Sequence, residues 1–430
     1  MGYNEGMRIY ISGISGTGMG PLALLAHDAG YEVCGSDLAR GAVYDELISA
    51  GIEVAIGEQD GEYLREQLER GVDWFVYTSA LPEDHAELVI AREAGIKCTK
   101  RDDFTEYLVE ELGLKMVAVA GTHGKTTTTA MIVWVALKLG LPVAYVAGTT
   151  LEFAASGAYH SGDKYFVYEA DEYDRNFLRY HPWLAVIPAV SYDHPDIYPT
   201  RKDYVAAFEQ FKKQSRVVIE YGRNDEIKYK GQGEETFFEP ERFRLAGEVR
   251  RRDAALAATA IEEIVNEDGS AVQNAEIIEV LDEFPGVGRR FEKISDGVYT
   301  DYAHHPEEVA ATIEVANDEC RVRGYKGVVV VYQPHQNTRQ HEVREGYREA
   351  FVGAAKVYWL PTYLTREKPD LAVITPEEFV AGLINAEVAE AAELGDGLAE
   401  TLREWLGKGY MVILMTAGPA DGWLREKFGG

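Results

Sequence analysis

Short apolar runs of strand-forming residues alternate with segments of helical periodicity along nearly all of this 430-residue chain. The first run, Arg8–Gly13, is followed by a glycine-rich turn and an apolar helical segment that ends near Gly30. Such alternation is typical of parallel sheets built from strand–helix–strand units. The pattern therefore predicts an α/β fold.

Three successive series of these runs predict three consecutive α/β domains, within the two to four that roughly 100–200 residues per domain would give. We expect a Rossmann-like N-terminal domain at residues 1–106, a central P-loop ATPase-type domain with a parallel sheet at 107–284, and a Rossmann-like C-terminal domain at 285–430. A Pro- and Gly-containing segment at 284–288 is a plausible hinge before the last domain. The polar stretch 224–240 is expected to form a surface loop.

The chain carries 43 Lys and Arg against 72 Asp and Glu, a formal charge of −29 at pH 7. Nucleic-acid recognition needs a net basic face, so this charge argues against a nucleic-acid partner. Any anionic ligand must be held locally by backbone N–H groups, a few cations or a metal ion. The chain has three cysteines and no CxxC pair, which is typical of a reducing compartment. It shows no secretory signal and no apolar run near the roughly 20 residues that cross a bilayer. These features predict a cytoplasmic protein without a membrane partner.

The strongest motif joins the expected strand 115–120 to a helix and reads Gly121-Thr122-His123-Gly124-Lys125-Thr126-Thr127. Its glycines let backbone N–H groups approach phosphates, and the helix N-terminus adds positive potential. We expect Lys125 to reach the β- and γ-phosphates of ATP and the Thr126 hydroxyl to ligate Mg²⁺. The strict pattern has a glycine where this chain has Val119, and a purely structural glycine-rich turn is the alternative.

Polar residues gather at the ends of the other expected strands as well, in the segments 169–174, 191–196, 301–305, 333–339 and 361–367. Ligands of open α/β sheets bind beyond the carboxyl ends of the strands, so we expect these loops to face a common cleft. Glu169 is a candidate ligand of a phosphate-bound Mg²⁺, which prefers oxygen. The alternative is that Glu169 belongs to a solvated acidic loop. His194, in the segment 191–196, offers an imidazole, but it could also be an ordinary loop histidine.

The first glycine-rich turn, Gly13–Met19, resembles a dinucleotide-binding fingerprint, but Ser15 occupies the place of the middle glycine. Asp37 follows the second expected strand, where an acidic residue contacts a ribose or base in such sites. The turn therefore predicts a pyrophosphate site, with a structural tight turn as the alternative.

Together these motifs resemble those of the Mur ligase family, in matching order and over nearly the whole chain. The similarity rests on residues 11–19, 78–80, 121–128, 169–173, 193–196, 286–291, 301–306 and 333–335, with Thr338 and Arg339. Asp301–Pro306 and Gln333-Pro334-His335 are most similar to the branch that joins L-alanine to UDP-N-acetylmuramate and to its close peptide-recycling relative. The resemblance implies an ATP-dependent, ADP-forming ligase of peptidoglycan precursor synthesis. The γ-phosphoryl group would pass to the lactyl carboxylate, and the amine of L-alanine would then attack the acyl phosphate.

The resemblance also assigns roles to individual residues. The catalytic residues would be Lys125, His194, His304 and Arg339. Mg²⁺ would be bound by Thr126, Glu169 and His194. ATP would be bound by the phosphate loop 121–127, with Asp301 near its ribose. The residues expected at the UDP-sugar are Gly13, Ser15, Gly16, Thr17, Gly18, Met19, Asp37, Thr78 and Ser79. His335 would border the amino acid together with His304 and Arg339.

The family usually has His and Asn before a helix in this region, and the Asn contacts adenine. This chain has Val249 and Arg250 at those two positions. Gln336 likewise replaces a common arginine. The alternatives are a recycling ligase that joins a murein peptide to UDP-N-acetylmuramate, a nucleotide-dependent oxidoreductase, and a catalytically weak nucleotide-binding relative. The sequence leaves open a monomer or weak dimer and the use of a carbamylated lysine.

Overall fold

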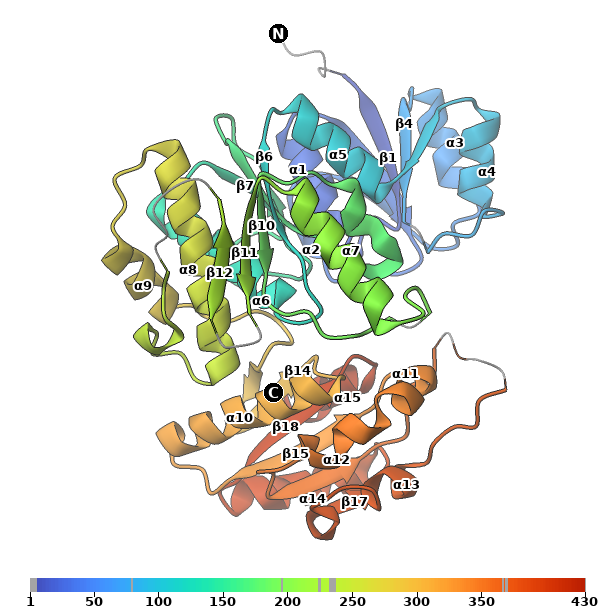
Figure 1. Ribbon diagram of the computed structural model, residues 1–430. Helices are drawn as coiled ribbons and strands as arrows, with labels where there is room; N and C mark the ends of the chain where they lie inside the picture. The colour runs from blue at the N-terminus through green and yellow to red at the C-terminus, as the bar shows by residue number, and fades with distance from the viewer. Residues whose placement is uncertain are drawn as a thin grey trace. The chain divides into compact units, whose positions relative to one another are not determined.

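The computed structural model describes residues 6–78, 80–194, 196–222, 226–231, 237–365, 367 and 370–429, coloured along the chain in Figure 1. The chain divides into two compact units. The first comprises Met1–Phe243 with Arg252–Pro285, and the second comprises Arg244–Arg251 with Gly286–Gly430. Among the described residues, none of the helices combines the length and the hydrophobicity needed to span a bilayer.

The first sheet has the strand order β3-β2-β1-β4-β5, and every neighbouring pair is parallel. Its strands are β1 (Arg8–Ser12), β2 (Glu32–Asp37), β3 (Glu53–Ile56), β4 (Trp74–Tyr77) and β5 (Lys97–Lys100). The order changes direction at β1, so the crossovers on its two sides leave the loops after β1 and β4 free for a ligand. The helices are α1 (Gly20–Asp28), α2 (Tyr44–Ser49), α3 (Glu62–Glu69), α4 (Ala86–Glu93) and α5 (Arg101–Glu111).

The second sheet has the order β12-β11-β10-β6-β9-β7-β8 and is parallel except at its two edges, where β12 and β8 are antiparallel. Its strands are β6 (Lys115–Val119), β7 (Val143–Val146), β8 (Gly157–Ala158), β9 (Tyr165–Glu169), β10 (Leu184–Ile187), β11 (Val217–Tyr221) and β12 (Ile227–Lys230). The helical segments are α6 (Lys125–Leu139), η1 (Tyr173–Arg179), α7 (Arg201–Gln214), η2 (Pro240–Arg242), α8 (Glu248–Asp268) and α9 (Asn274–Asp282).

The third sheet lies in the second unit, with the order β13-β14-β18-β15-β16-β17 and one antiparallel pair, β13 with β14. Its strands are β13 (Glu292–Ser295), β14 (Val298–Asp301), β15 (Val328–Gln333), β16 (Lys356–Trp359), β17 (Ala389–Ala391) and β18 (Met411–Thr416). The helical segments are α10 (Pro306–Arg323), α11 (Asn337–Glu342), η3 (Arg344–Gly346), α12 (Tyr347–Ala350), α13 (Pro376–Val380), η4 (Ala386–Val388), α14 (Asp396–Gly407) and α15 (Ala420–Phe428).

Central strands and the helix after the phosphate loop explain why the sequence adopts this class. β10, β15 and β18 are buried along their whole lengths, as expected for parallel strands covered on both faces. Every residue from Thr128 to Ala136 in α6 is also buried, so this stretch of the helix is covered on all sides. The predicted α/β fold with three parallel-rich sheets is confirmed.

Two details differ from the sequence-based expectations or extend them. The expected loop at 224–240 contains the edge strand β12, whose alternating exposure (half-buried, exposed) gave a weak sequence signal. The first two sheets share one hydrophobic core, which runs from Ile9 to Val218. A boundary between domains at residue 106 therefore stays a prediction.

Close contacts join the edge strand β8 to the first sheet's helices. Gly157 packs so tightly on α1 that an added Cβ would lie 2.0 Å from the Pro21 carbonyl oxygen. The Glu46 carboxylate of α2 accepts hydrogen bonds from the Ser156 backbone N–H at 2.6 Å and from its hydroxyl at 2.7 Å.

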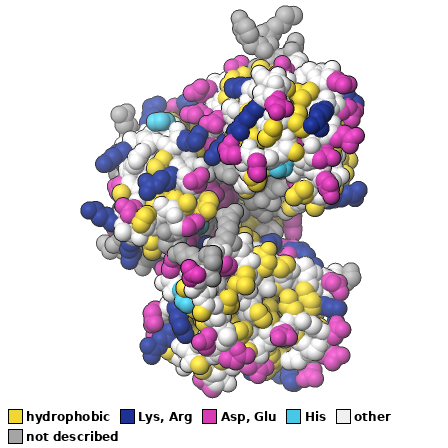
Figure 2. All heavy atoms as spheres, turned by 90° about the vertical axis from the view of Figure 1, so that its right-hand side faces the viewer, with side chains coloured by type: hydrophobic (Ala, Val, Ile, Leu, Met, Phe, Trp, Pro, Cys, Tyr) yellow, Lys and Arg dark blue, Asp and Glu magenta, His cyan; other side chains and the backbone are white. Residues whose placement is uncertain are grey.

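On the face shown in Figure 2, acidic and basic side chains are interspersed over the surface.

Candidate active site

The loop between β6 and α6 has the geometry of a phosphate cradle. Gly124 is the N-cap of α6 with φ +81°, and an added Cβ there would lie 2.7 Å from Asp253 Oδ1 and 2.8 Å from Pro188 Cβ. An added Cβ at Gly121 would lie 2.8 Å from the Ala189 carbonyl oxygen. Both positions therefore require glycine for steric reasons, and the first turn of α6, which includes Thr126 and Thr127, presents its N–H groups beyond the loop.

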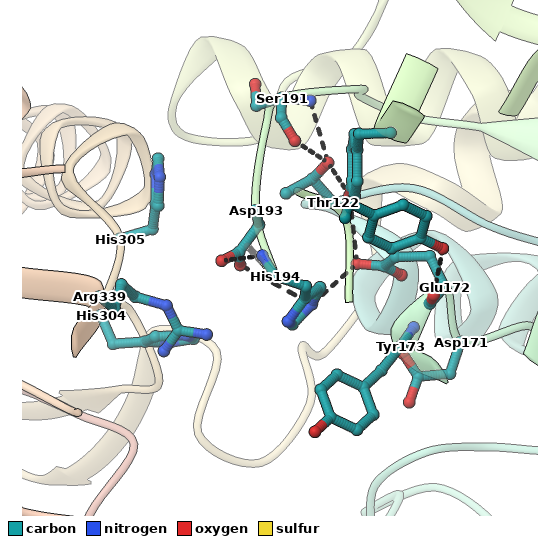
Figure 3. A network of polar contacts seen from close by, with 12 residues as sticks. Thr122, Asp171, Glu172, Tyr173, Ser191, Asp193, His194, His304, His305 and Arg339 are labelled. Carbon is teal, nitrogen blue, oxygen red and sulfur yellow. Dashed lines mark hydrogen bonds and ion pairs between the residues drawn. The ribbon is translucent and has the colours of Figure 1, made fainter. Parts of the chain in front are cut away.

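Thr122 attaches this loop to the end of β10. Its backbone N–H donates to the Ala189 carbonyl at 2.8 Å, and its hydroxyl donates to the Ser191 carbonyl at 2.7 Å. Figure 3 shows Thr122 and Ser191 in contact, and the same hydroxyl lies 2.7 Å from the Tyr204 hydroxyl. The Thr122 side chain thus holds the loop in place, and contact of Thr122 with the cofactor stays a prediction. His123 beside it is half-buried.

Lys125 is held by one carbonyl and one buried carboxylate. Its ammonium donates to the Gly121 carbonyl at 2.5 Å and to Glu172 Oε2 at 2.7 Å. Glu172 has an exposed fraction of only 1%. Burial opposes ionisation of Glu172, but Lys125 and His194 outweigh it and lower the pKa of this carboxyl. Burial likewise opposes the charge of Lys125, whose pKa is nevertheless raised by Glu172, Asp171 and Glu169.

His194 reaches the same carboxylate from the loop after β10. Its Nε2 lies 3.4 Å from Glu172 Oε1, a contact drawn in Figure 3, whereas Lys125 contacts the other oxygen, Oε2. The backbone of His194 has φ +55°, a conformation uncommon for residues other than glycine, and its N–H donates to Asp193 Oδ1 at 2.8 Å. Such strain is concentrated at functional sites.

Glu169 pairs with a different residue of the phosphate loop. The Thr126 hydroxyl donates to Glu169 Oε1 at 3.1 Å, and the carboxylate covers Gly148, where an added Cβ would lie 2.5 Å from Oε2. The predicted metal ligands therefore fall into two contacts, Thr126 with Glu169 and His194 with Glu172. Sequence analysis missed Glu172 as the partner of Lys125 and His194. The only signal was its place in the acidic run 169–174.

The glycine-rich loop after β1 uses its serine for its own structure. Ser15 is fully buried; its N–H donates to Asp37 Oδ2 at 3.0 Å and its hydroxyl to the same oxygen at 2.7 Å. The Ser15 hydroxyl also accepts the Gly41 N–H at 3.0 Å. These bonds place Asp37 under the loop, where it fixes the turn that begins at Gly13 with φ +78°.

The rest of this loop leads directly into α1. The N–H groups of Met19 and Gly20 donate to the Gly16 carbonyl at 3.2 and 2.9 Å. In the described part of the chain, the N–H groups of Thr17 and Gly18 have no acceptor within the protein. Thr78 follows β4 and lies next to Gly13. A Cβ added at Gly13 would be 3.8 Å from the methyl carbon of Thr78. Ser79 lies outside the described residues.

In the second unit, three predicted residues lie together beyond β14 and β15. The rings of His304 and His335 have centroids 5.8 Å apart, and Arg339 Nη1 lies 3.3 Å from His335 Nδ1. Glu308 Oε2 lies 3.3 Å from His304 Nδ1 and also accepts the His304 N–H at 3.0 Å. The hydroxyls of Tyr332 and Tyr347 both donate to the His304 carbonyl, at 3.0 and 2.9 Å, which fixes this loop.

Asp301, the residue expected near a ribose, is buried at the end of β14. Its carboxylate accepts the N–H groups of Phe291 and Ala303, each at 2.7 Å, and the Thr312 hydroxyl at 3.3 Å. Burial raises its pKa, against the nearby Arg290. These contacts give Asp301 a structural task in its own unit, and a ribose contact stays a prediction.

Comparison with known proteins covers the same segments. Residues 8–111 match the family model described as "Mur ligase family, catalytic domain", and residues 119–238 match "Mur ligase middle domain". A UDP-N-acetylmuramate–L-alanine ligase from Lactobacillus delbrueckii subsp. bulgaricus is 30% identical, over 96% of this chain and 95% of its own. A ligase of the same name from Paenarthrobacter aurescens is 31% identical, over 98% of this chain and 97% of its own.

The chain belongs to the Mur ligase family. Mur ligases are ATP-dependent ligases, and this chain is an enzyme of that class. A solved UDP-N-acetylmuramate–alanine ligase from Thermotoga maritima is 22% identical and superimposes with a TM-score of 0.71, covering 98% of both chains, so the two share a fold.

For this Mur ligase, the two departures from the family pattern lie in the second unit. Val249 and Arg250 are both half-buried near the start of α8. Gln336 has φ +67° and is the N-cap of α11, and its N–H donates to the Tyr363 carbonyl at 2.9 Å. Gln336 thus sets the turn that presents His335 and Arg339.

Proposed function

We propose that this Mur ligase joins L-alanine to the lactyl carboxylate of UDP-N-acetylmuramate, forms ADP and phosphate, and acts in cytoplasmic peptidoglycan precursor synthesis. The observation that carries the proposal is the Lys125–Glu172–His194 contact beside the phosphate loop. It supports the proposal because one cation and two side chains that could ligate a metal meet beside the loop that would bind the terminal phosphate. The names of the two relatives support the choice of substrates.

The residues around the phosphate loop fit ATP with Mg²⁺. Mg²⁺ prefers oxygen ligands and is usually held by one or two carboxylates plus phosphate oxygens. The Thr126 hydroxyl, Glu169 and Glu172 supply protein oxygens, and His194 supplies an imidazole. When bound, Mg²⁺ would neutralise phosphate charge during transfer.

The chain's own groups would position and neutralise the reactants. N–H groups of the phosphate loop and the Lys125 ammonium bind the phosphates, and Glu172 orients Lys125 and His194. The loop after β1 holds the UDP pyrophosphate. In the second unit, His304, His335 and Arg339 are the proposed contacts of the amino acid, and Asp301 supports the turn next to them.

The acyl phosphate is the expected intermediate because a carboxylate is a poor acceptor for an amine until its oxygen becomes a good leaving group. Attack by the amine then gives a tetrahedral centre from which phosphate leaves. The net charge of −29 is compatible with this chemistry, because phosphoryl transfer depends on local charge neutralisation rather than on overall charge.

The test is an assay of phosphate release with ATP, Mg²⁺, UDP-N-acetylmuramate and L-alanine. Release should require all four components and should fall by orders of magnitude in Lys125→Ala, while Arg92→Ala on the surface of α4 should behave as wild type. Phosphate release that ignores the UDP-sugar would rule out the ligase reaction. A panel of L-alanine, L-serine, glycine and a murein tripeptide identifies the acceptor. Preference for the tripeptide would assign the recycling reaction instead.

A further inference from the structure

The guanidinium of Arg101 lies against the glycine-rich loop after β1, although Arg101 itself is part of α5. Arg101 begins α5, more than eighty residues from Gly18 in sequence. An added Cβ at Gly18 would lie 3.0 Å from Arg101 Nη1. Glycine at position 18 therefore makes room for this guanidinium beside the loop.

The geometry of Arg101 leaves one edge of its guanidinium turned to the loop. Nε and Nη2 each lie 3.1 Å from Asp102 Oδ1, whose carboxylate is buried and also accepts the Tyr180 hydroxyl at 3.2 Å. Nη1 has no hydrogen-bond partner among the residues that the structure describes. The side chain is 24% exposed, so solvent or a ligand can reach it.

The loop next to Arg101 needs a cation if it is to hold a diphosphate. Residues 13–19 contain no Lys or Arg, and the Ser15 hydroxyl is used by Asp37, whose carboxylate brings negative charge under the loop. The N–H groups of Thr17 and Gly18 lack a protein acceptor in the described part of the chain. Two free N–H groups at the start of α1 and an adjacent guanidinium form a set of donors suited to a phosphate oxygen.

Arg101 also contributes to the electrostatics of the neighbouring nucleotide loop. Burial and the nearby Glu172 raise the pKa of Asp171, whereas Lys125 and Arg101 act in the opposite direction. The influence of Arg101 thus extends from the loop after β1 to the loop after β9. Both loops belong to the first unit.

We propose that Arg101 binds the pyrophosphate of the UDP-sugar, together with the N–H groups of Thr17 and Gly18. The inference rests on the proposed function for the identity of the ligand, and it adds a residue of α5 to that site. Arginine suits the task because a planar guanidinium can bind Asp102 along one edge and a phosphate oxygen along another.

The experiment measures the affinity of the full-length protein for UDP, UDP-N-acetylglucosamine and UDP-N-acetylmuramate by calorimetry. Arg101→Ala should weaken binding of all three ligands by about 10- to 100-fold, since a charge-assisted hydrogen bond is lost. Arg101→Lys should retain part of the affinity. The KM for the UDP-sugar should rise while the KM for ATP stays unchanged.

Two matched variants separate binding from a structural role. Asp102→Asn weakens the ion pair but keeps the guanidinium, and it should retain UDP affinity within a few-fold. Arg92→Ala removes a surface guanidinium that pairs with Glu83 at 2.7 Å, and it should bind UDP as wild type. Thermal melting of each variant reports on folding, and Arg101→Lys decides the question if Arg101→Ala does not fold.

Several outcomes would overturn the inference. Unchanged UDP affinity in Arg101→Ala, or an equal loss in Asp102→Asn, would make Arg101 a structural residue. A loss confined to UDP-N-acetylmuramate would assign Arg101 to the lactyl carboxylate instead of the pyrophosphate. Wild-type protein that binds no UDP would refute the proposed function itself, whereas binding without ligation would refute only the ligase reaction.

Discussion

Lys125 and His194 approach the buried Glu172 from two different loops, at 2.7 and 3.4 Å. Each contact compensates part of the cost of keeping a carboxylate out of water, which is large for an unpaired charge. The same contacts hold the lysine and the imidazole at the phosphate loop. At this scale, the proposed function and the stability of the fold would depend on the same three side chains.

Glu172→Gln tests this coupling through its dependence on pH. The folded-state pKa of Glu172 lies below its ordinary value of 4.5, so the carboxylate stabilises the fold above that pH and loses its effect as the pH falls through the folded-state pKa. The variant should be less stable than wild type at pH 7 by about 3–5 kcal/mol, the usual cost of breaking a buried pair. The gap between their denaturant midpoints should shrink below pH 4.5.

Denaturation in guanidinium at several pH values measures that gap. The control is Glu83→Gln, which removes a surface pair with Arg92 and should cost at most about 1 kcal/mol. A gap for Glu172→Gln that stays constant down to the acid transition would contradict the assigned ion pair.

Gly124→Ala tests the phosphate cradle at a single Cβ. The substitution places a methyl group 2.7 Å from Asp253 Oδ1 in a backbone with φ +81°, so the loop must shift and ATP affinity should fall at least tenfold. Gly140→Ala is the matched control, because Gly140 caps the other end of α6 with φ +66° and has open space around it. It should cost only about 1 kcal/mol of stability and leave ATP binding unchanged.

At the scale of elements, the loops at the carboxyl ends of parallel strands carry the residues of the proposed site. A short antiparallel edge strand connects the sheets of the first unit. β8 has only two residues, yet it packs on α1, and the chain next to it bonds to α2. The contact needs glycine because the backbones of β8 and α1 come too close for a side chain. The two sheets consequently bury a common core.

Gly157→Ala should separate these elements. Its added methyl group would overlap the Pro21 carbonyl oxygen, so β8 must move, at a cost of about 1–3 kcal/mol, as for other overpacked sites. Gly407→Ala in α14 has open space and should be neutral or slightly stabilising. Thermal denaturation compares the two variants. An unchanged melting temperature for Gly157→Ala would show that the contact is looser than described.

At the scale of the whole molecule, the chain folds as two units with separate cores. One core spans both sheets of the first unit, and two further clusters lie within the second unit. Separate cores can open independently, because each buries its own apolar surface. A ligand that binds one unit should therefore stabilise that unit and leave the other unchanged.

UDP provides the test, since its proposed site lies wholly in the first unit. At about 100 times its dissociation constant it should add about 2.7 kcal/mol of stability to that unit. Hydrogen exchange followed by mass spectrometry should show slower exchange in core strands such as β1 and β6 and no change in β15 or β18. Inorganic phosphate at the same concentration is the control. Equal protection of β15 would show that the units unfold together.

Much of the fold and part of the site could be predicted from the sequence. Gly124, Lys125 and Thr126 lie in one short segment, and the strand before it and the helix after it determine their geometry. The same holds for β15, whose run of valines can form a buried parallel strand but not a surface helix. Local sequence patterns are sufficient to predict a structural feature when a single segment contains all of its residues.

Only the tertiary structure decided which residues meet across segments. The acidic run after β9 offers several carboxylates, and in the fold Glu172 contacts Lys125 whereas Glu169 contacts Thr126. Ser15 turns inward because Asp37 of another strand accepts its hydroxyl. Arg101 reaches Gly18 because α5 packs beside the first loop. Such contacts depend on long-range packing. Residues far apart in the sequence meet only once the chain is folded, so their spacing along the sequence could not reveal the contacts.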